Sequence, residues 1–150
     1  MKVVGISGSP RKNGNTEVLL KKALEPFYEK NWTVKEHLLS EYRIGPCQAC
    51  DFCRETNVCR IEDDMSRIYE DLLDCDALIV ASPVYYRNVS AQLKAVFDRV
   101  YALRSARPLV GVFGGGIAVG RGTGGGQCIA LTVIYNFFLS SGVICVPGEL

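Results

Sequence analysis

Four of the seven cysteines stand close together in the chain, at Cys47, Cys50, Cys53 and Cys59. Two successive two-residue spacers curl a short loop so that three thiolates converge on one small object, and a fourth thiolate a few residues later closes the shell. In a reducing compartment such a tight group of cysteines points to a metal centre more often than to disulfides.

The spacing within this group favours an iron–sulfur cluster over a single zinc ion. It resembles the run that holds [4Fe–4S] clusters in bacterial ferredoxins, although that run has three residues before its last cysteine and a proline after it. Here five residues intervene and Arg60 follows. A structural zinc site with four cysteine ligands usually shows two separated Cys-x2-Cys knuckles. Zinc and unliganded thiols remain the alternatives.

The remaining cysteines, Cys75, Cys128 and Cys145, are isolated in the sequence. Free cysteine is among the most buried residue types, so we expect these three in the core. His37 is the only histidine, and we expect it to be at the surface or half-buried. No acid–base or nucleophilic constellation is apparent, and no catalytic residue is predicted.

A polar loop, residues 7–16, joins the first predicted strand to the first predicted helix. Such a loop presents backbone N–H groups at the positive end of a helix, an arrangement that suits a phosphate. Arg11 adds a bidentate cationic fork. Neutral donors are available from Ser7, Ser9, Asn13, Asn15 and Thr16. The loop matches neither the Walker nor the Gly-x-Gly-x-x-Gly pattern. The alternative is a capping loop that binds nothing.

Two further loops are candidates for holding a flat ring. Residues 82–90 follow the third predicted strand and contain Tyr85 and Tyr86, which could instead pack beneath their own loop. Residues 114–126 are expected to form a glycine-rich loop after the fourth strand, and glycine lets the backbone approach a planar ligand closely.

Apolar runs and helical periodicity alternate along the chain. Strands are expected at 2–7, 33–39, 76–82, 109–113 and 143–146, and helices from Asn15 or Thr16 to about Pro26, over 65–73, after a Ser90 cap, and over 127–139. Residues 40–61 show no good periodicity. Continuous apolar strands separated by helices indicate a parallel sheet covered on both faces.

The predicted fold is therefore α/β, a flavodoxin-like, doubly wound, five-stranded parallel sheet in a three-layer sandwich, with strand order 2-1-3-4-5. We expect one domain over residues 1–150, with the cysteine loop at about 44–61 after the second strand. In this order strands one and three flank the switch point where ligands bind. The last strand is followed by only four residues, so an uncovered apolar surface that needs a partner is expected.

Composition narrows the classes of partner. The 150 residues are 48% hydrophobic with a net charge of +1, which gives no electrostatic reason to bind nucleic acid or an anionic membrane. No apolar run approaches the roughly 20 residues of a membrane span, and the N-terminus lacks the long apolar segment of a signal peptide. The expected location is the cytoplasm.

Two motifs resemble the NADPH-dependent FMN reductase superfamily of flavodoxin-like proteins. They are Gly8-Ser9-Pro10-Arg11 through Asn15-Thr16, and Ser82-Pro83-Val84-Tyr85-Tyr86 through Leu93 to Arg99. The resemblance covers about residues 2–126. It implies that Ser9, Arg11, Asn13, Asn15 and Thr16 hold the FMN phosphate. It also implies that Pro83, Val84, Tyr85, Tyr86, Gly114 and Gly115 border the isoalloxazine.

The cysteine spacing resembles that of the iron–sulfur flavoproteins, a branch of the same superfamily whose members carry FMN and a [4Fe–4S] cluster. This resemblance implies a redox protein that transfers electrons between the two cofactors, receives them from a ferredoxin-like donor, and reduces O2, H2O2 or another small acceptor. It also implies a homo-oligomer in which the cluster of one subunit lies close to the FMN of another. The alternatives are an NAD(P)H-dependent FMN or quinone reductase with a structural zinc site, and a pure electron carrier.

Overall fold

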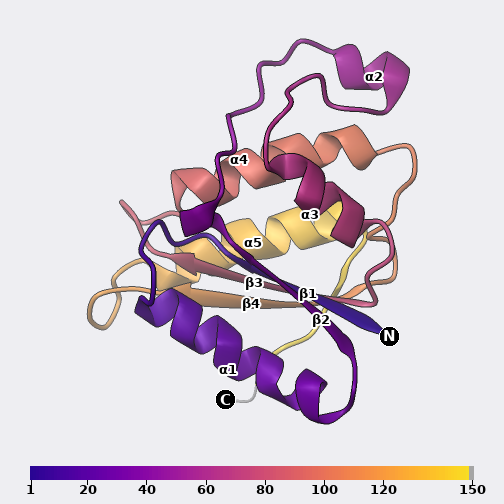
Figure 1. Ribbon diagram of the computed structural model, residues 1–150. Coiled ribbons are helices and arrows are strands. Elements are labelled where there is room, and N and C mark those ends of the chain that lie inside the picture. The colour runs from indigo at the N-terminus through magenta and orange to yellow at the C-terminus, as the bar shows by residue number, and fades with distance from the viewer. Residues whose placement is uncertain (149–150) are drawn as a thin grey trace.

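The computed structural model describes residues 1–148, which form a five-stranded sheet between two layers of helices (Figure 1). The strands are β1 (Lys2–Ser7), β2 (Thr33–Leu38), β3 (Ala77–Pro83), β4 (Phe113–Val119) and β5 (Ile144–Cys145). The helices are α1 (Asn15–Glu29), α2 (Phe52–Thr56), α3 (Met65–Leu72), α4 (Ala91–Val100) and α5 (Gln127–Ser141), with 3₁₀ turns η1 (Leu39–Glu41) and η2 (Tyr101–Leu103).

The sheet is parallel throughout, with the order β2-β1-β3-β4-β5. This confirms the predicted flavodoxin-like topology. Helix α1 lies on one face of the sheet, and α3, α4 and α5 lie on the other (Figure 1). The strand ends at β1 and β3 therefore meet at one edge, where ligands bind in folds of this type.

The side chains on the two faces of β1 belong to two separate hydrophobic clusters. Val3 packs with Leu20 and Leu24 of α1, whereas Val4 and Ile6 belong to the larger cluster on the α4 and α5 side. Burial on both faces is the reason that this strand reads as a continuous apolar run without alternation.

The prediction of the fourth strand at 109–113 was wrong. The strand begins at Phe113 and contains Gly114, Gly115 and Gly116, the residues expected to form a loop. A Cβ at Gly114 would clash with Val143 and would lie 3.1 Å from the Phe138 ring. Close packing of the following segment against this strand therefore requires glycine there, and it overrides the usual preference of glycine for loops.

Three smaller differences concern element ends. Helix α1 continues through Pro26 to Glu29, although proline removes the hydrogen bond that its N–H would otherwise donate to the Lys22 carbonyl. The five-residue α2 forms inside the cysteine loop, where no helix was expected. Strand β5 covers two residues rather than four.

The burial predicted for the isolated cysteines and for His37 was confirmed only at Cys75. Cys75 is buried, as expected, and burial raises the pKa of its thiol to about 11. Cys128 was expected in the core but is exposed on the first turn of α5, and Cys145 is only half-buried on the short edge strand. His37 was expected at the surface or half-buried, but it is 3% exposed.

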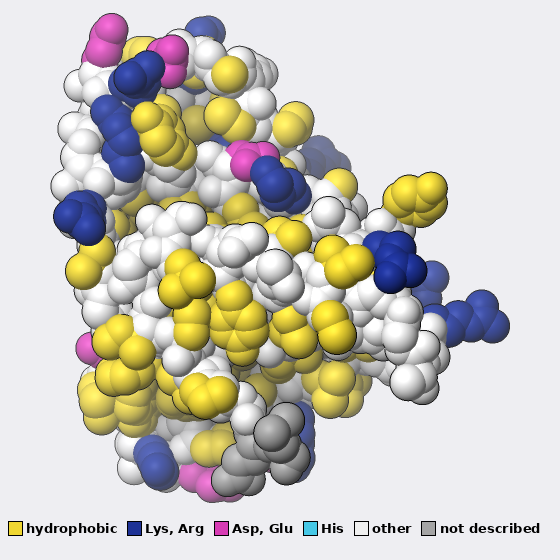
Figure 2. All heavy atoms as spheres, turned by 180° about the vertical axis from the view of Figure 1, so that it is seen from behind, with side chains coloured by type: hydrophobic (Ala, Val, Ile, Leu, Met, Phe, Trp, Pro, Cys, Tyr) yellow, Lys and Arg dark blue, Asp and Glu magenta, His cyan; other side chains and the backbone are white. Residues whose placement is uncertain are grey.

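Hydrophobic side chains gather across much of the face seen in Figure 2. In the second half of the sequence, the large apolar residues that are about half exposed or more include Phe113, Leu139 and Ile144. Within residues 1–148, no helix is long and apolar enough to cross a membrane.

Candidate cofactor sites

The loops after β1 and β3 are tied together at the carboxyl edge of the sheet. Gly8 donates its N–H to the Ala81 carbonyl at 2.7 Å, and the Ser90 hydroxyl donates to the Gly8 carbonyl at 2.6 Å. The same Ser90 oxygen accepts from the Leu93 N–H at 3.2 Å and so caps α4. A Cβ at Gly8 would lie 2.8 Å from the Leu93 Cβ, so only glycine permits this approach.

The loop before α1 has the features of an anion cradle. Its helix begins after Gly14, which has no side chain to cap the first turn, so the first N–H groups are free to meet a ligand. The side chains of Arg11, Asn13 and Asn15 are exposed, whereas Thr16 is buried. The Ser9 hydroxyl is buried and accepts from the Arg11 N–H at 3.1 Å, so it also shapes the loop.

A buried carboxylate in the first turn of α1, beside this loop, was not anticipated. Glu17 is 4% exposed, and its side chain accepts from the Asn13 N–H at 2.8 Å. A hydrogen bond from Lys21 at 2.7 Å, aided by the Asn13 bond, holds the pKa of Glu17 below its ordinary value. A fixed negative charge therefore stands beside the cradle, which makes the neighbouring cations Arg11 and Lys12 more important for an anionic ligand.

The loop after β3 makes a tight turn that exposes both tyrosines. Tyr85 and Asn88 exchange backbone hydrogen bonds at 3.0 and 3.1 Å, and Tyr86 and Arg87 adopt positive φ angles of 46° and 62° between them. The Tyr86 side chain is fully exposed and Tyr85 is 39% exposed. Pro83 is buried at the end of the strand, and Val84 is half-buried. Tyr86 therefore does not pack beneath its loop.

Gly114 and Gly115 do not lie at this edge. They pair with Leu78 and Ile79 near the start of β3, whereas the carboxyl end of β4 is Val119, opposite Pro83. Their predicted place after the fourth strand was wrong because the strand itself begins later. The segment that does reach the edge is 120–126. There Gly126, with a φ of 102°, packs so closely against Arg87 that a Cβ would lie 2.9 Å from the Arg87 Cα.

The four clustered cysteines line one hollow of about 500 Å³, together with Phe97 and Tyr101. Cys47 and Cys50 are exposed, and Cys53 and Cys59 are half-buried. Positive φ angles at Ala49, Asp51 and Asn57 turn the loop around this hollow. In the described part of the chain, no three Cys, His, Asp or Glu side chains are grouped closely enough to hold a single metal ion.

The cysteine loop runs over α4 toward its C-terminal end (Figure 1). Two arginines from that end hold it. The guanidinium of Arg104 donates to the carbonyls of Cys53 and Arg54 at 2.8 and 2.7 Å, and Arg99 holds the loop ends described below. The two candidate sites therefore lie toward opposite ends of α4, a helix about 15 Å long.

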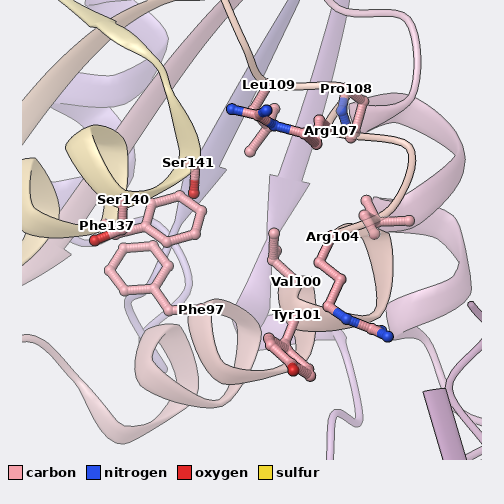
Figure 3. A pocket seen from close by; sticks show the side chains of 11 residues that line it. Phe97, Val100, Tyr101, Arg104, Arg107, Pro108, Leu109, Phe137, Ser140 and Ser141 are labelled. Carbon is pink, nitrogen blue, oxygen red and sulfur yellow. The ribbon is translucent and has the colours of Figure 1, made fainter. Parts of the chain in front are cut away.

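A second hollow, of about 280 Å³, adjoins the cysteine loop between α4, η2 and α5 (Figure 3). The rings of Phe97 and Phe137 stack on one side of it with centroids 4.1 Å apart. Figure 3 shows the Arg104 side chain pointing away from these rings, consistent with its bonds to the cysteine loop. Phe97 and Tyr101 line both hollows.

His37 belongs to a buried network away from both sites. Its Nδ1 lies 2.9 Å from the Tyr42 hydroxyl, and its Nε2 lies 3.1 Å from Asp71 Oδ2. Burial lowers the pKa of His37, although the Asp71 carboxylate opposes that effect. The network joins β2 to α3, the elements on either side of the cysteine loop.

Comparisons with known proteins match flavoproteins over nearly the whole chain. The pattern of the NADPH-dependent FMN reductase family matches residues 1–150. An iron–sulfur flavoprotein of Methanocaldococcus jannaschii is 41% identical over 146 residues, which cover 97% of this chain and 76% of that protein. An iron–sulfur flavoprotein of Archaeoglobus fulgidus is 44% identical over 148 residues, covering 97% and 75%.

Solved structures agree on the fold. A flavodoxin from the domain Archaea superposes with a TM-score of 0.64 at 16% identity and covers 99% of this chain and 80% of its own. Taken with the strand order and the two motif-bearing loops at the carboxyl edge, these matches show that the chain belongs to the NADPH-dependent FMN reductase family, as a flavoprotein oxidoreductase whose relatives include iron–sulfur flavoproteins.

Proposed function

We propose that this protein transfers electrons between FMN and a [4Fe–4S] cluster held by Cys47, Cys50, Cys53 and Cys59. The observation that carries the proposal is the convergence of these four cysteines on one hollow of about 500 Å³, which can hold a multi-atom cluster. Thiolates are the usual ligands of such clusters. When bound, the cluster would exchange single electrons and the flavin one or two, which joins one-electron donors to two-electron acceptors.

The residues of the carboxyl edge would bind and orient the flavin. Arg11, Asn13, Asn15 and Thr16 would surround the phosphate at the start of α1, with Ser9 shaping the loop. Pro83, Val84, Tyr85 and Tyr86 would border the ring. The exposed Tyr86 side chain is free to lie against a planar ligand. Gly114 and Gly115 are not part of this assignment, because they lie at the other end of the sheet.

We further propose a homo-oligomer and a ferredoxin-like electron donor, with O2, H2O2 or another small molecule as acceptor. Two observations support the oligomer. The two candidate sites are separated by the length of α4 within one subunit, so a second copy can offer a shorter path. Exposed apolar side chains such as Phe113 and Ile144 also leave surface for a partner. Light scattering at micromolar concentration tests the assembly, and a monomer with rapid, concentration-independent transfer would contradict it.

The visible spectrum of anaerobically purified protein tests both cofactors together. Flavin bands with a broad shoulder at longer wavelength, and four irons per chain, are expected. Zinc without iron would favour the second candidate function, an NAD(P)H-dependent FMN or quinone reductase, to which the family match points. Steady-state oxidation of NADPH, compared with reduction by ferredoxin, then distinguishes a reductase from a cluster-linked electron transfer protein.

A further inference from the structure

One arginine holds both ends of the cysteine loop. Arg99, on the last turn of α4, is 2% exposed although it carries a full charge. Its guanidinium donates to the Gly45 carbonyl at 3.2 Å, where the loop begins, and to the Ile61 carbonyl at 3.0 Å, where the loop ends. Few side chains other than arginine can reach two carbonyls and a carboxylate at once.

Asp63 completes the arrangement. One of its carboxylate oxygens lies 2.5 Å from the Arg99 guanidinium and also accepts from the Gly45 N–H at 2.9 Å. The other accepts from the Met65 N–H at 3.1 Å, at the start of α3. Burial opposes the charged form of both residues, but the hydrogen bonds between them raise the pKa of Arg99 and lower that of Asp63. The pair is thus charged and internally neutralised.

The pair also lies close to one of the cysteines. The Tyr69 hydroxyl donates to the Arg99 carbonyl at 2.8 Å, and Tyr69 and Cys59 line one further hollow. Asp63 lines this hollow as well. The side chains that close the loop are therefore in the immediate surroundings of its last cysteine.

We propose that Arg99 and Asp63 are positioning residues that clamp the two ends of the cysteine loop and thereby hold Cys47, Cys50, Cys53 and Cys59 in place for cluster binding. The assignment of a cluster rests on the proposed function, whereas the clamp is a property of the chain alone. Asp63→Asn leaves the buried Arg99 charge without its partner. Arg99→Lys keeps the charge but lacks the planar fork that reaches both carbonyls and the carboxylate. Either single substitution is therefore expected to loosen the loop.

The experiment compares Arg99→Lys and Asp63→Asn with Cys50→Ser. The first two break the clamp but keep all four cysteines, whereas Cys50→Ser removes a ligand but keeps the clamp. The readouts are iron per chain after anaerobic reconstitution, FMN bound per chain, and hydrogen exchange at the Gly45 amide, which donates directly to Asp63. Lys94→Met is the control, because it removes an exposed cation from the same helix.

All three variants are expected to lose most of their iron. Gly45 exchange should accelerate about tenfold or more in Arg99→Lys and Asp63→Asn and stay near the parent rate in Cys50→Ser. FMN binding should stay within about twofold in all of them, because Ser90 and the flavin loops lie at the other end of α4. The double variant Arg99→Lys with Asp63→Asn should lose no more iron than either single variant, since the two residues act as one unit.

Parent-like iron content and Gly45 exchange in Arg99→Lys would overturn the clamp, as would FMN loss in proportion to iron loss, which indicates global unfolding. In preparations of Arg99→Lys that retain iron, the electron paramagnetic resonance spectrum of the reduced cluster should broaden, and an unchanged spectrum would also count against positioning. If the parent bound no iron, the proposed function would fail, while the Gly45 exchange rates would still decide on the clamp.

Discussion

Replacing Ser90 by alanine should destabilise the protein and weaken flavin binding together. The Ser90 side chain is fully buried, and its oxygen makes two bonds: it accepts from the Leu93 N–H and donates to the Gly8 carbonyl. Loss of a helix cap costs about 1 kcal/mol. A buried carbonyl left without its donor costs about 1–3 kcal/mol. The expected loss in unfolding free energy is therefore roughly 2–4 kcal/mol.

Urea unfolding of the FMN-free protein measures this loss, and a shifted midpoint with an unchanged slope indicates a change in stability alone. Ser66→Ala is a matched control, because the exposed Ser66 hydroxyl makes one hydrogen bond within residues 1–148, to the Asp63 carbonyl just before α3. It should change stability by less than about 0.5 kcal/mol. A loss below about 1 kcal/mol in Ser90→Ala, or unchanged FMN affinity, would refute the reasoning that Ser90 joins the two loops.

Three other predictions concern the cofactor loops and pH. Cys50→Ser should abolish or degrade iron binding while FMN is largely retained, whereas Cys128→Ala should leave iron near the parent value in elemental analysis. Arg11→Ala should weaken FMN binding by roughly 1.5–3 kcal/mol, and riboflavin should bind far more weakly than FMN; equal affinities in a fluorescence titration would exclude the phosphate cradle. Because burial lowers the folded-state pKa of His37, the unfolded state binds more protons as pH falls below about 6.5, so stability should decline there. Urea unfolding at several pH values checks this, and His37→Gln should flatten that part of the profile.

The sheet was predictable because its strands carry strong local signals. The run at Ala77 is apolar on both faces, and Ser90 stands where a helix cap is needed, so both predictions were confirmed. The bounds of strand β4 were not predicted, because its glycines are required by close contacts with Val143 and Phe138, which are distant in sequence. Local propensity cannot reveal a clash that exists only in the folded chain.

The site shows the same division. The cysteine spacing and the polar loop at Arg11 were visible in the sequence, because both are local patterns of residue type. Arg99 stood in a family-like motif, but its part in holding the cysteine loop was not predicted, because its partner Asp63 is 36 residues away. The carboxylate of Glu17 escaped for a simpler reason: its position in a first helical turn is ordinary, and only the fold shows that it is buried.

Two separate loops constrain the position of helix α4, one at each of its ends. Its first residues are fixed to the flavin loops through Ser90, and its last turn is fixed to the cysteine loop through Arg99. A helix of ten residues is stiff, so a substitution that slides it along its axis displaces both ends by the same amount. Changes at buried Val96 should therefore disturb both candidate sites at once, whereas the outer face at Lys94 can vary freely. Attempts to redesign either site separately will succeed more readily in the loops than in the helix between them.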